Sequence, residues 1–596
     1  MKNLVVIFSM IVVLCFQLGC GSDDVVDPNI ESSDNSLKIE NGNRFEIIDE
    51  VNLTSMYESE VRNLEPNTEM NLITVIQGTD KVSIDVKYIG MREFNLGFPV
   101  YEFELTNSLL EEMGGIAAGM SGSPVGPEGR VIGALAYGDI FGTSPYRFWV
   151  ASIDGMEEAK DNPAFGEFLD LPGAPSIHVR QSPIKSPFVI SGINGNNAKN
   201  LINRLNSSNR LNSIEFVNDI GGEFANAPTT SDELEPGDMI GVAVADGDVV
   251  DIFAYGTVTQ VYPDGKFLAF GHSLQYDGMV SIPVYKAIAS GIVSNLQSSY
   301  KSVTHYGQPI GTLTKDLSAA VVGELGDAPD TIPVHVSYHP VNSKDPIETL
   351  TKVAYGQEWS IPLVVSLTAD SLRREYTNGT SAGKIVFEFE ETKQTYTQKW
   401  RNISDNPFFD TYENVEYAIL QIVDSINNIT AKATLKSVHV ELVDKPEIAS
   451  AEIIELEIPD DIKAGSKSTF KITLLPHWSI IKNDDRTITE EISIDIPVDF
   501  ELDFSTVIVR SENVDLFDLT YDFDYDFDIG ISLDEEDESL ETLEDLIDKM
   551  ESDIPDPGTI KLIIKPDDIL SDHIESDIII GEYVVDGRVT DIIFLD

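Results

Sequence analysis

Apolar and polar residues alternate along much of the chain, in short runs that end at turn residues. Residues 82–86 (VSIDV) are one such run, and residues 72–76 (LITVI) are a short, mostly apolar run separated from it by a Gly-Thr-Asp turn. Residues 100–105 (VYEFEL) alternate in the same way. A repeat of two residues places successive side chains on opposite faces of a β-strand. The pattern therefore predicts a mainly β protein.

The alternation continues in the second half of the chain. Residues 453–458 (IIELEI) and 493–498 (SIDIPV) keep a period of two. Short strands of this kind, separated by turn residues, are typical of two packed antiparallel sheets. Residues 346–515 are therefore predicted to form a β-sandwich-like region. A helix is expected in the first half of the chain at residues 198–205, in a stretch otherwise rich in Asn, Ser and Gly.

The chain is strongly acidic. Its 596 residues include 40 Lys and Arg against 101 Asp and Glu, a formal net charge of −61. A surface this negative repels phosphate backbones, which argues against a nucleic-acid partner. Much of the acidity lies in residues 516–596, predicted to be α+β. Within this region a helix is predicted at residues 540–550, with three apolar side chains on one face: Leu543, Ile547 and Met550.

Four aspartates alternate with aromatic residues in the acidic region: Asp522, Asp524, Asp526 and Asp528. In a strand they would line one face, where either a bound calcium ion or plain solvation would relieve their repulsion. Solvation is the favoured interpretation, because no glycine-turned calcium loop accompanies them. Calcium is kept as the alternative.

The first 20 residues have the character of a lipoprotein signal peptide. Lys2 is followed by an apolar run over residues 4–16 that is too short to cross a bilayer comfortably. The run ends at Leu-Gly-Cys, which resembles a lipobox with Cys20 as the acylated residue. Residues 21–45 are polar and are predicted to be a flexible tether. We expect an exported protein held at the cell envelope, on the outer membrane or cell surface; an ordinary secretory signal is the alternative.

Cysteine chemistry is restricted by the signal. The chain has two cysteines, Cys15 and Cys20, so cleavage before Cys20 leaves one, which the lipid uses. A disulfide, a thiolate nucleophile and a cysteine metal site are then excluded. His335 and His339 are four residues apart, but Pro340 and the β context deny them a shared helical face, so no metal site is expected. The other histidines besides His272 are interpreted as structural or surface residues: His178, His305, His439, His477 and His573.

A candidate catalytic motif lies at residues 119–124, Gly-Met-Ser-Gly-Ser-Pro. A serine between glycines in a tight turn exposes its hydroxyl and directs backbone N–H groups toward one point. The N–H groups of Gly119 and Ser121 would then form an oxyanion hole for acyl transfer. The motif alone is weak, because a glycine-rich hairpin with a buried serine has the same sequence.

Residues 114–124, followed by Gly-Arg-Val-Ile-Gly-Ala at residues 129–134, resemble the nucleophile region of the SpoIVB-type serine peptidases. Residues 270–272, Phe-Gly-His, resemble the segment that presents the catalytic histidine of that family. The resemblance covers residues 72–150 and 240–340. It implies a trypsin-like double β-barrel with Ser121 as nucleophile and His272 as base, the two meeting near hydrogen-bond distance in a cleft.

The chain departs from the family in two ways. The serine half precedes the histidine half, which implies a circularly permuted order that triad geometry permits. The family's acid position is occupied by Thr106, which carries no charge. Asp316 is the best substitute acid and Asp139 the second, although an aspartate at a β-turn usually serves the turn itself.

The expected function is limited cleavage of a protein partner, or self-cleavage, by a serine endopeptidase that needs no cofactor. The alternative is a non-catalytic, peptidase-like binding lipoprotein of the envelope or cell surface, which the missing acid favours; an adhesin is a third interpretation. The expected organisation is a signal peptide at 1–20, a tether at 21–45, a serine half at 46–175, a connector or small subdomain at 176–235, a histidine half at 236–345, the sandwich-like region at 346–515 and the acidic region at 516–596.

Overall fold

The computed structural model is mainly β, as the sequence predicts. It divides into two compact units, residues 1–47 and 48–596. In the first unit the described residues form a hairpin of β1 (Ser36–Lys38) and β2 (Arg44–Ile48). The structure describes residues 36–38, 44–48, 50–92, 96–107, 110, 115–139, 146–162, 181–183, 186–192, 196–207, 214–218, 233–275, 278–294, 299–340, 343, 345–373, 379–404, 407–428, 433–445, 449–477, 486–500, 502, 505–511, 542–553, 558–566, 573–580, 584–586 and 588–593.

Six strands near the start of the second unit close into a ring, which we call the first ring. Their antiparallel pairings run β5–β4–β7–β9–β10–β6 and return to β5. The alternation predicted at residues 82–86 is confirmed, since Val82, Ile84 and Val86 are buried. The strands are β4 (Glu69–Val75), β5 (Lys81–Arg92), β6 (Val100–Leu105), β7 (Pro124–Gly126), β9 (Gly133–Asp139) and β10 (Arg147–Ser152).

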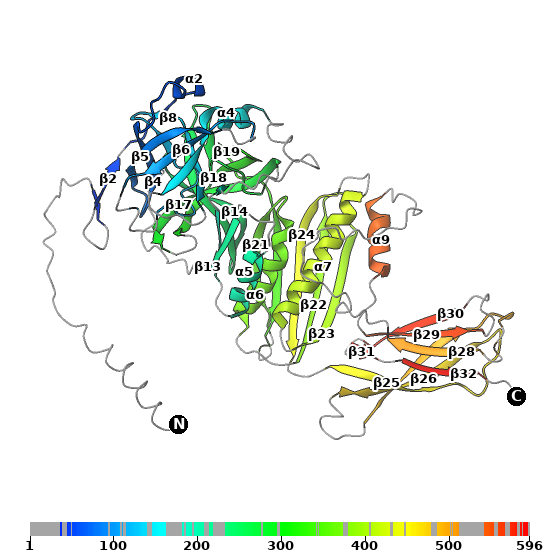
Figure 1. Ribbon diagram of the computed structural model, residues 1–596. Helices are drawn as coiled ribbons and strands as arrows, with labels where there is room; N and C mark the ends of the chain where they lie inside the picture. Colours follow the sequence, from blue (N-terminus) through cyan, green and yellow to red (C-terminus); the bar gives the residue numbers. More distant parts are fainter. Residues whose placement is uncertain are drawn as a thin grey trace, which may run out of the picture. The chain divides into compact units, whose positions relative to one another are not determined.

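A second set of six strands follows, drawn largely in green in Figure 1. Its pairings run β15–β16–β19–β18–β17–β14 and also return to the starting strand, and we call it the second ring. The predicted Pro-Asp-Gly turn joins β15 to β16, where Gly265 N–H donates to Tyr262 O at 3.0 Å. The strands are β14 (Met239–Gly247), β15 (Asp251–Val261), β16 (Lys266–Ala269), β17 (Gly278–Val293), β18 (Tyr300–Leu317) and β19 (Ala320–Leu325).

The sheet continues from the second ring in both directions. Strand β14 has a bulge between Ala243 and Ala245, and its last residues, 245–247, pair with β21. From β21 the order runs β20, β24, β22 and β23. On the other side β12 pairs with β15 and, in parallel, with β13, and α5 connects the two parallel strands. These elements are β12 (Ser186–Ser191), α5 (Asn196–Ser207), β13 (Ile214–Asn218), β20 (Thr331–His339), β21 (Ile347–Ala354), β22 (Gly379–Phe389), β23 (Thr395–Ser404) and β24 (Leu435–Lys445).

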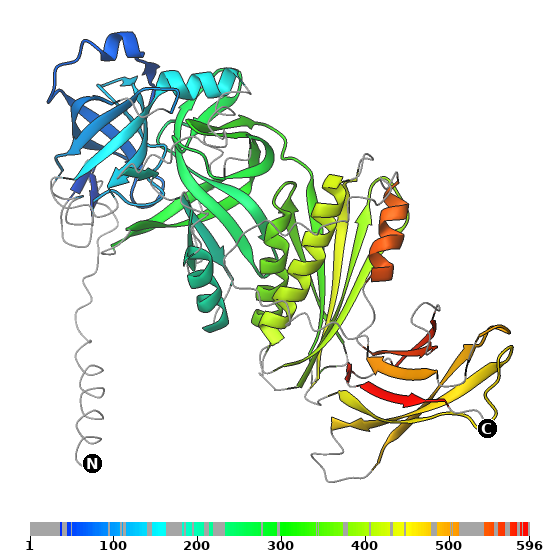
Figure 2. The ribbon, with the colours of Figure 1, turned by 45° about the vertical axis from the view of Figure 1, so that its right-hand side comes forward.

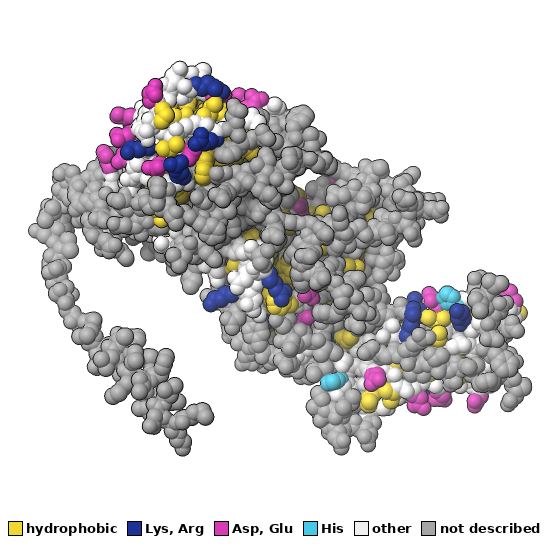
Figure 3. Space-filling model, viewed as in Figure 1, with side chains coloured by type: hydrophobic (Ala, Val, Ile, Leu, Met, Phe, Trp, Pro, Cys, Tyr) yellow, Lys and Arg dark blue, Asp and Glu magenta, His cyan; other side chains and the backbone are white. Residues whose placement is uncertain are grey.

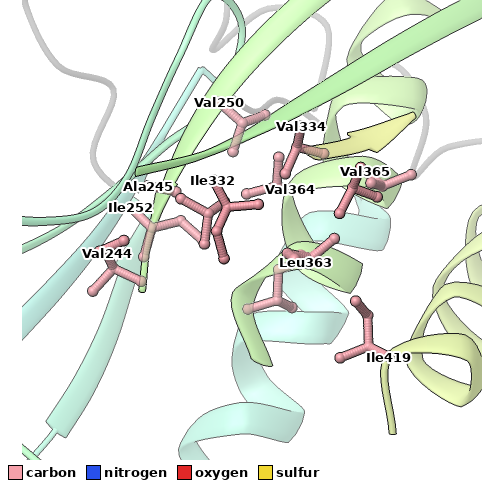
Figure 4. Close-up of a cluster of buried hydrophobic side chains, with 14 of the residues drawn as sticks. Val244, Ala245, Val250, Ile252, Ile332, Val334, Leu363, Val364, Val365 and Ile419 are labelled. Atoms are coloured by element: carbon pink, nitrogen blue, oxygen red, sulfur yellow. The ribbon is translucent and has the colours of Figure 1, made fainter. Parts of the chain in front are cut away.

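Two helices, α6 (Ile361–Leu372) and α7 (Pro407–Asn428), cover one face of this extended sheet in both ribbon views (Figures 1 and 2). Figure 4 shows Leu363, Val364 and Val365 of α6 among valines and isoleucines of the sheet. The prediction of sandwich throughout residues 346–515 is therefore wrong for residues 347–445. The physical reason is the helical spacing of the buried apolar side chains of α7: Phe408, Tyr412, Val415, Ile419 and Ile422.

From residue 450 the described strands form two further sheets. These two four-stranded sheets share one core of buried side chains, among them Phe470, Ile492 and Leu562. The predicted strand at residues 453–458 corresponds to β25, and the one at 493–498 begins inside β27. The strands are β25 (Ser450–Glu457), β26 (Lys467–Pro476), β27 (Ile488–Asp495) and β31 (Val584–Asp586) in one sheet, and β28 (Thr506–Ser511), β29 (Thr559–Lys565), β30 (Ile574–Ile579) and β32 (Arg588–Ile592) in the other.

Both predicted helices are confirmed. The helix expected at 198–205 is α5, and the one expected at 540–550 is α9 (Leu543–Asp553). Leu543, Ile547 and Met550 are buried in the core that the extended sheet shares with its helices. Within the described part of the chain, no helix has the length and apolar character needed to cross a membrane.

Shorter elements complete the described fold. A two-residue parallel pairing joins β3 (Thr54–Ser55) to β8 (Arg130–Val131), and β11 (Gln181–Pro183) pairs with β9. The short helices are α2 (Glu58–Val61), α4 (Ile153–Asp161) and η3 (Glu358–Ser360). Figure 3 shows Lys and Arg side chains beside Asp and Glu on one face of the first ring; Arg147, for example, pairs with Glu102 at 2.6 Å.

A buried ion pair fixes the end of α6 to β24. Arg373 Nε lies 2.6 Å from Asp444 Oδ2, and their side chains are 1% and 10% exposed. The hydroxyl of Tyr338 donates to the same carboxylate at 3.1 Å. Burial alone would lower the pKa of Arg373, but the charge and hydrogen bond of Asp444 outweigh it, so the pKa is raised above its ordinary value.

We expect Asp444→Ala to destabilise the protein by about 3–5 kcal/mol, because it leaves the buried guanidinium of Arg373 without its carboxylate. Urea unfolding followed by fluorescence measures the change. The matched control is Glu388→Ala, which breaks the exposed pair with Lys436 and should cost less than about 1 kcal/mol. Equal losses in the two variants would contradict a structural role for the buried pair.

Candidate active site

Residues 117–123, which we call the serine turn, connect the first ring's β6 to β7. Met120 N–H donates to Ala117 O and Ser123 N–H to Met120 O, each at 3.0 Å, so that two tight turns follow one another. Gly119 and Gly122 have φ of +88° and +91°, a region that suits glycine and strains other residues. The glycines of the motif are therefore required by the backbone path on both sides of Ser121.

The N–H groups of Gly119 and Ser121 differ from the neighbouring backbone donors of the serine turn. Ala118 N–H donates to Ser299 O at 2.7 Å, and Gly122 N–H to Leu135 O at 2.8 Å. Among the described residues, no acceptor is recorded for the N–H groups of Gly119 and Ser121. These are the two donors that the sequence assigns to the oxyanion hole. Buried N–H groups are nearly always paired, so two open donors flanking one residue are a feature expected of a site that binds an anion.

The second ring holds the carbonyl side of the serine turn. Thr257 N–H donates to Ser121 O at 2.9 Å, and its hydroxyl donates to Gly119 O at 3.1 Å. Thr259 donates its hydroxyl to Gly122 O at 2.7 Å. Three carbonyls of the turn, those of Gly119, Ser121 and Gly122, are thus bound by β15. The N–H groups of Gly119 and Ser121 remain available.

The backbones of the two rings approach so closely here that Gly122 has no room for a side chain. A Cβ on Gly122 would lie 1.9 Å from Thr257 O and 2.4 Å from Phe270 N. On the other side, a Cβ on Gly271 would lie 3.0 Å from the Cβ of Ala134, in β9. The residue after Ser121 and the two residues before His272 therefore lie in this one contact, and the structure brings the serine and histidine segments together.

The two side chains are buried in this contact but not joined. Ser121 is 0% and His272 is 1% exposed. The Ser121 hydroxyl has no hydrogen-bond partner within the described residues, so it is not bonded to His272. His272 Nδ1 lies 2.7 Å from Ser273 O. Because a carbonyl only accepts, Nδ1 carries a proton there and Nε2 is left as the basic nitrogen.

Asp316 supports the histidine segment through its backbone. Its carboxylate is buried, 2% exposed, and lies at the end of β18. Oδ1 accepts from Leu274 N–H at 2.7 Å and Oδ2 from Gln275 N–H at 2.6 Å. Of the acids named from the sequence, Asp316 is the one that the structure places beside the segment carrying His272.

The other two acid positions lie elsewhere. Thr106 follows β6, is exposed, and donates its hydroxyl to Asp85 O at 3.0 Å. Asp139 ends β9, where its backbone pairs with Gln181; its side chain is outside the described residues. No recorded contact joins Thr106 to the histidine segment.

Sequence reasoning missed a lysine under the serine turn. Lys301, in β18, is completely buried, and its Nζ lies within hydrogen-bond distance of Thr74 Oγ1, at 2.8 Å. Burial lowers the pKa of Lys301 to about 7. Thr257 and Thr259 were missed as well. A threonine or a lysine in a strand gives no signal in the sequence, because its role here comes from packing between the two rings.

Some of the remaining predicted sites lie outside the described residues, and others lie within them. Cys20 and the aspartate run at Asp522–Asp528 lie outside the described residues. In the described part of the chain, no group of three or more metal-ligating side chains is placed to hold an ion. His335 stacks on His439 with ring centroids 4.6 Å apart, and His339 pairs with Glu441 at 3.3 Å. Comparison of the chain with protein-family models, curated proteins and solved structures finds no match.

We expect Gly122→Ala to destabilise the protein by about 3 kcal/mol or more, because its methyl group would collide with the backbone of the second ring. Gly129→Ala is the matched control. Gly129 also has a positive φ, +71°, but nothing lies within 4 Å of the position that its new methyl group would take, so it should cost only about 1–2 kcal/mol. Chemical denaturation of both variants measures the difference, and a Gly122→Ala protein as stable as the control would refute the close approach.

Proposed function

We propose that the protein is an exported serine endopeptidase that cleaves a protein partner, or itself, at a limited number of positions. Ser121 is the nucleophile and His272 the base. The observation that carries this proposal is the serine turn, in which the N–H groups of Gly119 and Ser121 are open while the turn itself rests against the segment of His272. The two rings of six strands would then correspond to the halves of a trypsin-like double barrel in permuted order.

The chemistry follows from the placement of these groups. His272 Nε2 takes the hydroxyl proton as Ser121 Oγ bonds to the peptide carbonyl carbon, and the N–H groups of Gly119 and Ser121 hold the oxyanion. The imidazolium returns the proton to the leaving amine as the C–N bond breaks. Water, activated by the same nitrogen, then hydrolyses the acyl-enzyme. Asp316 keeps the histidine segment in place, and no cofactor is needed.

The burial of the site is the reason why we propose limited cleavage. A substrate cannot reach a serine that is 0% exposed until the segments that cover it open. The hydrogen bond from Ser121 to His272 would form in that opened state, since catalytic hydrogen bonds commonly tighten only when substrate is bound. Cleavage that requires such a rearrangement suits a regulatory peptidase better than a digestive one.

One observation favours a second function. The Ser121 hydroxyl is buried without a hydrogen bond, and the family's acid position, Thr106, is turned to Asp85. A non-catalytic binding lipoprotein would keep the paired rings as a scaffold and use the two sheets from residue 450 onward for its partner, because a fold outlives its chemistry.

Labelling by a fluorophosphonate probe separates the two functions, since a histidine-activated serine reacts and an ordinary serine does not. We expect the purified mature protein to be labelled at Ser121, faster as pH rises through the range in which histidine loses its proton. Ser121→Ala and His272→Ala should abolish labelling, and Asp316→Ala should slow it by roughly tenfold or more.

Thr106→Asp is the control for the acid. Because Thr106 is exposed and bound to Asp85, a carboxylate there should leave the labelling rate unchanged. A faster rate would move the acid role from Asp316 to position 106. A folded wild-type protein that is not labelled at any pH would replace the peptidase by the binding lipoprotein.

We also propose that the protein is anchored by lipid on Cys20, at the outer membrane or cell surface. The apolar run that ends at Cys20 supports this. Cys20→Ala should move the protein from the membrane fraction to the soluble fraction, because a mature chain without its lipid has lost the proposed anchor. Cys15→Ala, inside the removed segment, is the control. Unchanged fractionation of Cys20→Ala would exclude the anchor.

A further inference from the structure

The most unusual buried group outside the proposed dyad is the amine of Lys301. It lies between three segments: Thr74 of β4, Met239 of β14 and the serine turn. Nζ lies 2.8 Å from Thr74 Oγ1 and 3.3 Å from Met239 Sδ. The Lys301 Cβ lies 3.4 Å from the position that a Cβ on Gly119 would take. One lysine side chain therefore packs against both rings and against the proposed oxyanion hole.

No carboxylate compensates this amine. Lys301 forms no ion pair within the described residues, and its low pKa is caused by burial. The serine turn carries no acidic or basic side chain. The titratable groups on and beside the packed strands are engaged with other partners: Glu235 and Asp238 with Lys81, His305 with Tyr255, and Asp246 with Tyr285.

The hydrogen-bonding capacity of this pocket suits an amine better than an ammonium ion. An ammonium group has three donors and needs three acceptors. The recorded acceptors are the Thr74 hydroxyl and the Met239 sulfur, which is a weak one. A neutral amine has a lone pair that can instead accept the Thr74 proton. This agrees with the pKa of about 7 for Lys301, since an unpaired buried charge is costly.

The amine is connected to the serine turn by side chain and by backbone. Ser123 donates its hydroxyl to Thr74 Oγ1 at 2.9 Å, so Thr74 links the amine to the end of the turn. At the start of the turn, Lys301 N–H donates to Ala118 O at 2.9 Å. Both ends of the segment that carries Ser121 are thus bound to Lys301.

We propose that Lys301 is a positioning residue of the serine turn, which through Thr74 and Ser123 keeps the turn in its present geometry only while its side chain is uncharged. With the amine neutral, the protons run from Ser123 to Thr74 and from Thr74 to the Lys301 lone pair. Protonation removes that lone pair, forces the Thr74 hydroxyl to reorient, and puts an unpaired cation beneath the turn. The turn then loosens.

The consequence for catalysis rests on the proposed function. The effect of Lys301 on the serine turn does not. An ordered turn keeps the N–H groups of Gly119 and Ser121 aimed at one point. Lys301 would therefore confine an active site to neutral and alkaline conditions, in addition to the requirement for an unprotonated histidine. The protein would be held inactive in an acidic compartment.

Amide hydrogen exchange of peptides covering residues 115–125, in the full-length mature protein, tests the geometry without needing activity. A group with a pKa of about 7 is roughly 90% neutral at pH 8 and roughly 90% charged at pH 6. After correction for intrinsic rates, we expect exchange of the turn to be about tenfold faster at pH 6 than at pH 8. Lys301→Met should remove this pH dependence.

The controls separate the relay from general destabilisation. Thr74→Val cuts the link between Lys301 and Ser123 and should also remove the pH dependence, while Thr74→Ser should restore it. Lys436→Met, at an exposed lysine paired with Glu388, should behave as wild type. If Lys301→Met does not fold, the two Thr74 variants decide alone. Exchange of the wild-type turn that is the same at both pH values, or equally pH-dependent in Thr74→Val, overturns the proposal.

Fluorophosphonate labelling adds the catalytic readout. The wild-type labelling rate should fall at low pH more steeply than one proton allows, since His272 and Lys301 both take up a proton, and Thr74→Val should give a one-proton slope. A pH-dependent turn in a protein that is never labelled would support the role of Lys301 and refute the peptidase. Wild-type labelling whose rate falls with a one-proton slope would support the peptidase and refute the role of Lys301.

Discussion

The contact between two backbones at Gly122 is the constraint on which the site depends. The serine turn lies against Thr257 and Phe270 with no space for even a methyl group, so its carbonyls meet β15 and its remaining N–H groups are left open. A side chain at this position would separate the rings and, with them, the serine and histidine segments. The hydroxyls of Thr257 and Thr259 then complete the attachment by donating to the carbonyls of Gly119 and Gly122.

The same closeness explains why the site is both ordered and closed. Polar groups excluded from water interact strongly, which favours charge stabilisation by fixed donors. Exclusion from water also makes every unmet hydrogen bond expensive, and this region contains several polar groups with few partners, among them Ser121 and the amine of Lys301. Such groups are tolerated where the surrounding sheets over-determine the geometry, and two closed rings provide that restraint.

Local pattern predicted the elements better than their assembly. The run at residues 100–105 became β6 without change, although the strand is buried on both faces and Glu104 alone is partly exposed. The closing of six strands into a ring has no comparable signal, since it depends on pairings between distant strands such as β5 and β6. The helix α7 did have a signal, in the spacing of Phe408, Val415 and Ile419, which its β-rich surroundings obscured. Ser121 and His272 were proposed from a resemblance, whereas Lys301 looks like any other lysine in a strand until its neighbours are known.

The path of β14 has a consequence for how this molecule can be divided. Residues 239–245 pair with β15 inside the second ring, and after the bulge residues 245–247 pair with β21 of the helix-covered sheet. One strand thus joins the ring to the helix-covered sheet, their buried side chains form one continuous core, and there is no loop at which the two parts separate. A recombinant fragment that stops after β20 would leave this strand with an open edge and bare the apolar floor beneath α6, inviting self-association. A shortened or recombined gene would therefore have to keep the ring and the helical layer together, although their architectures differ.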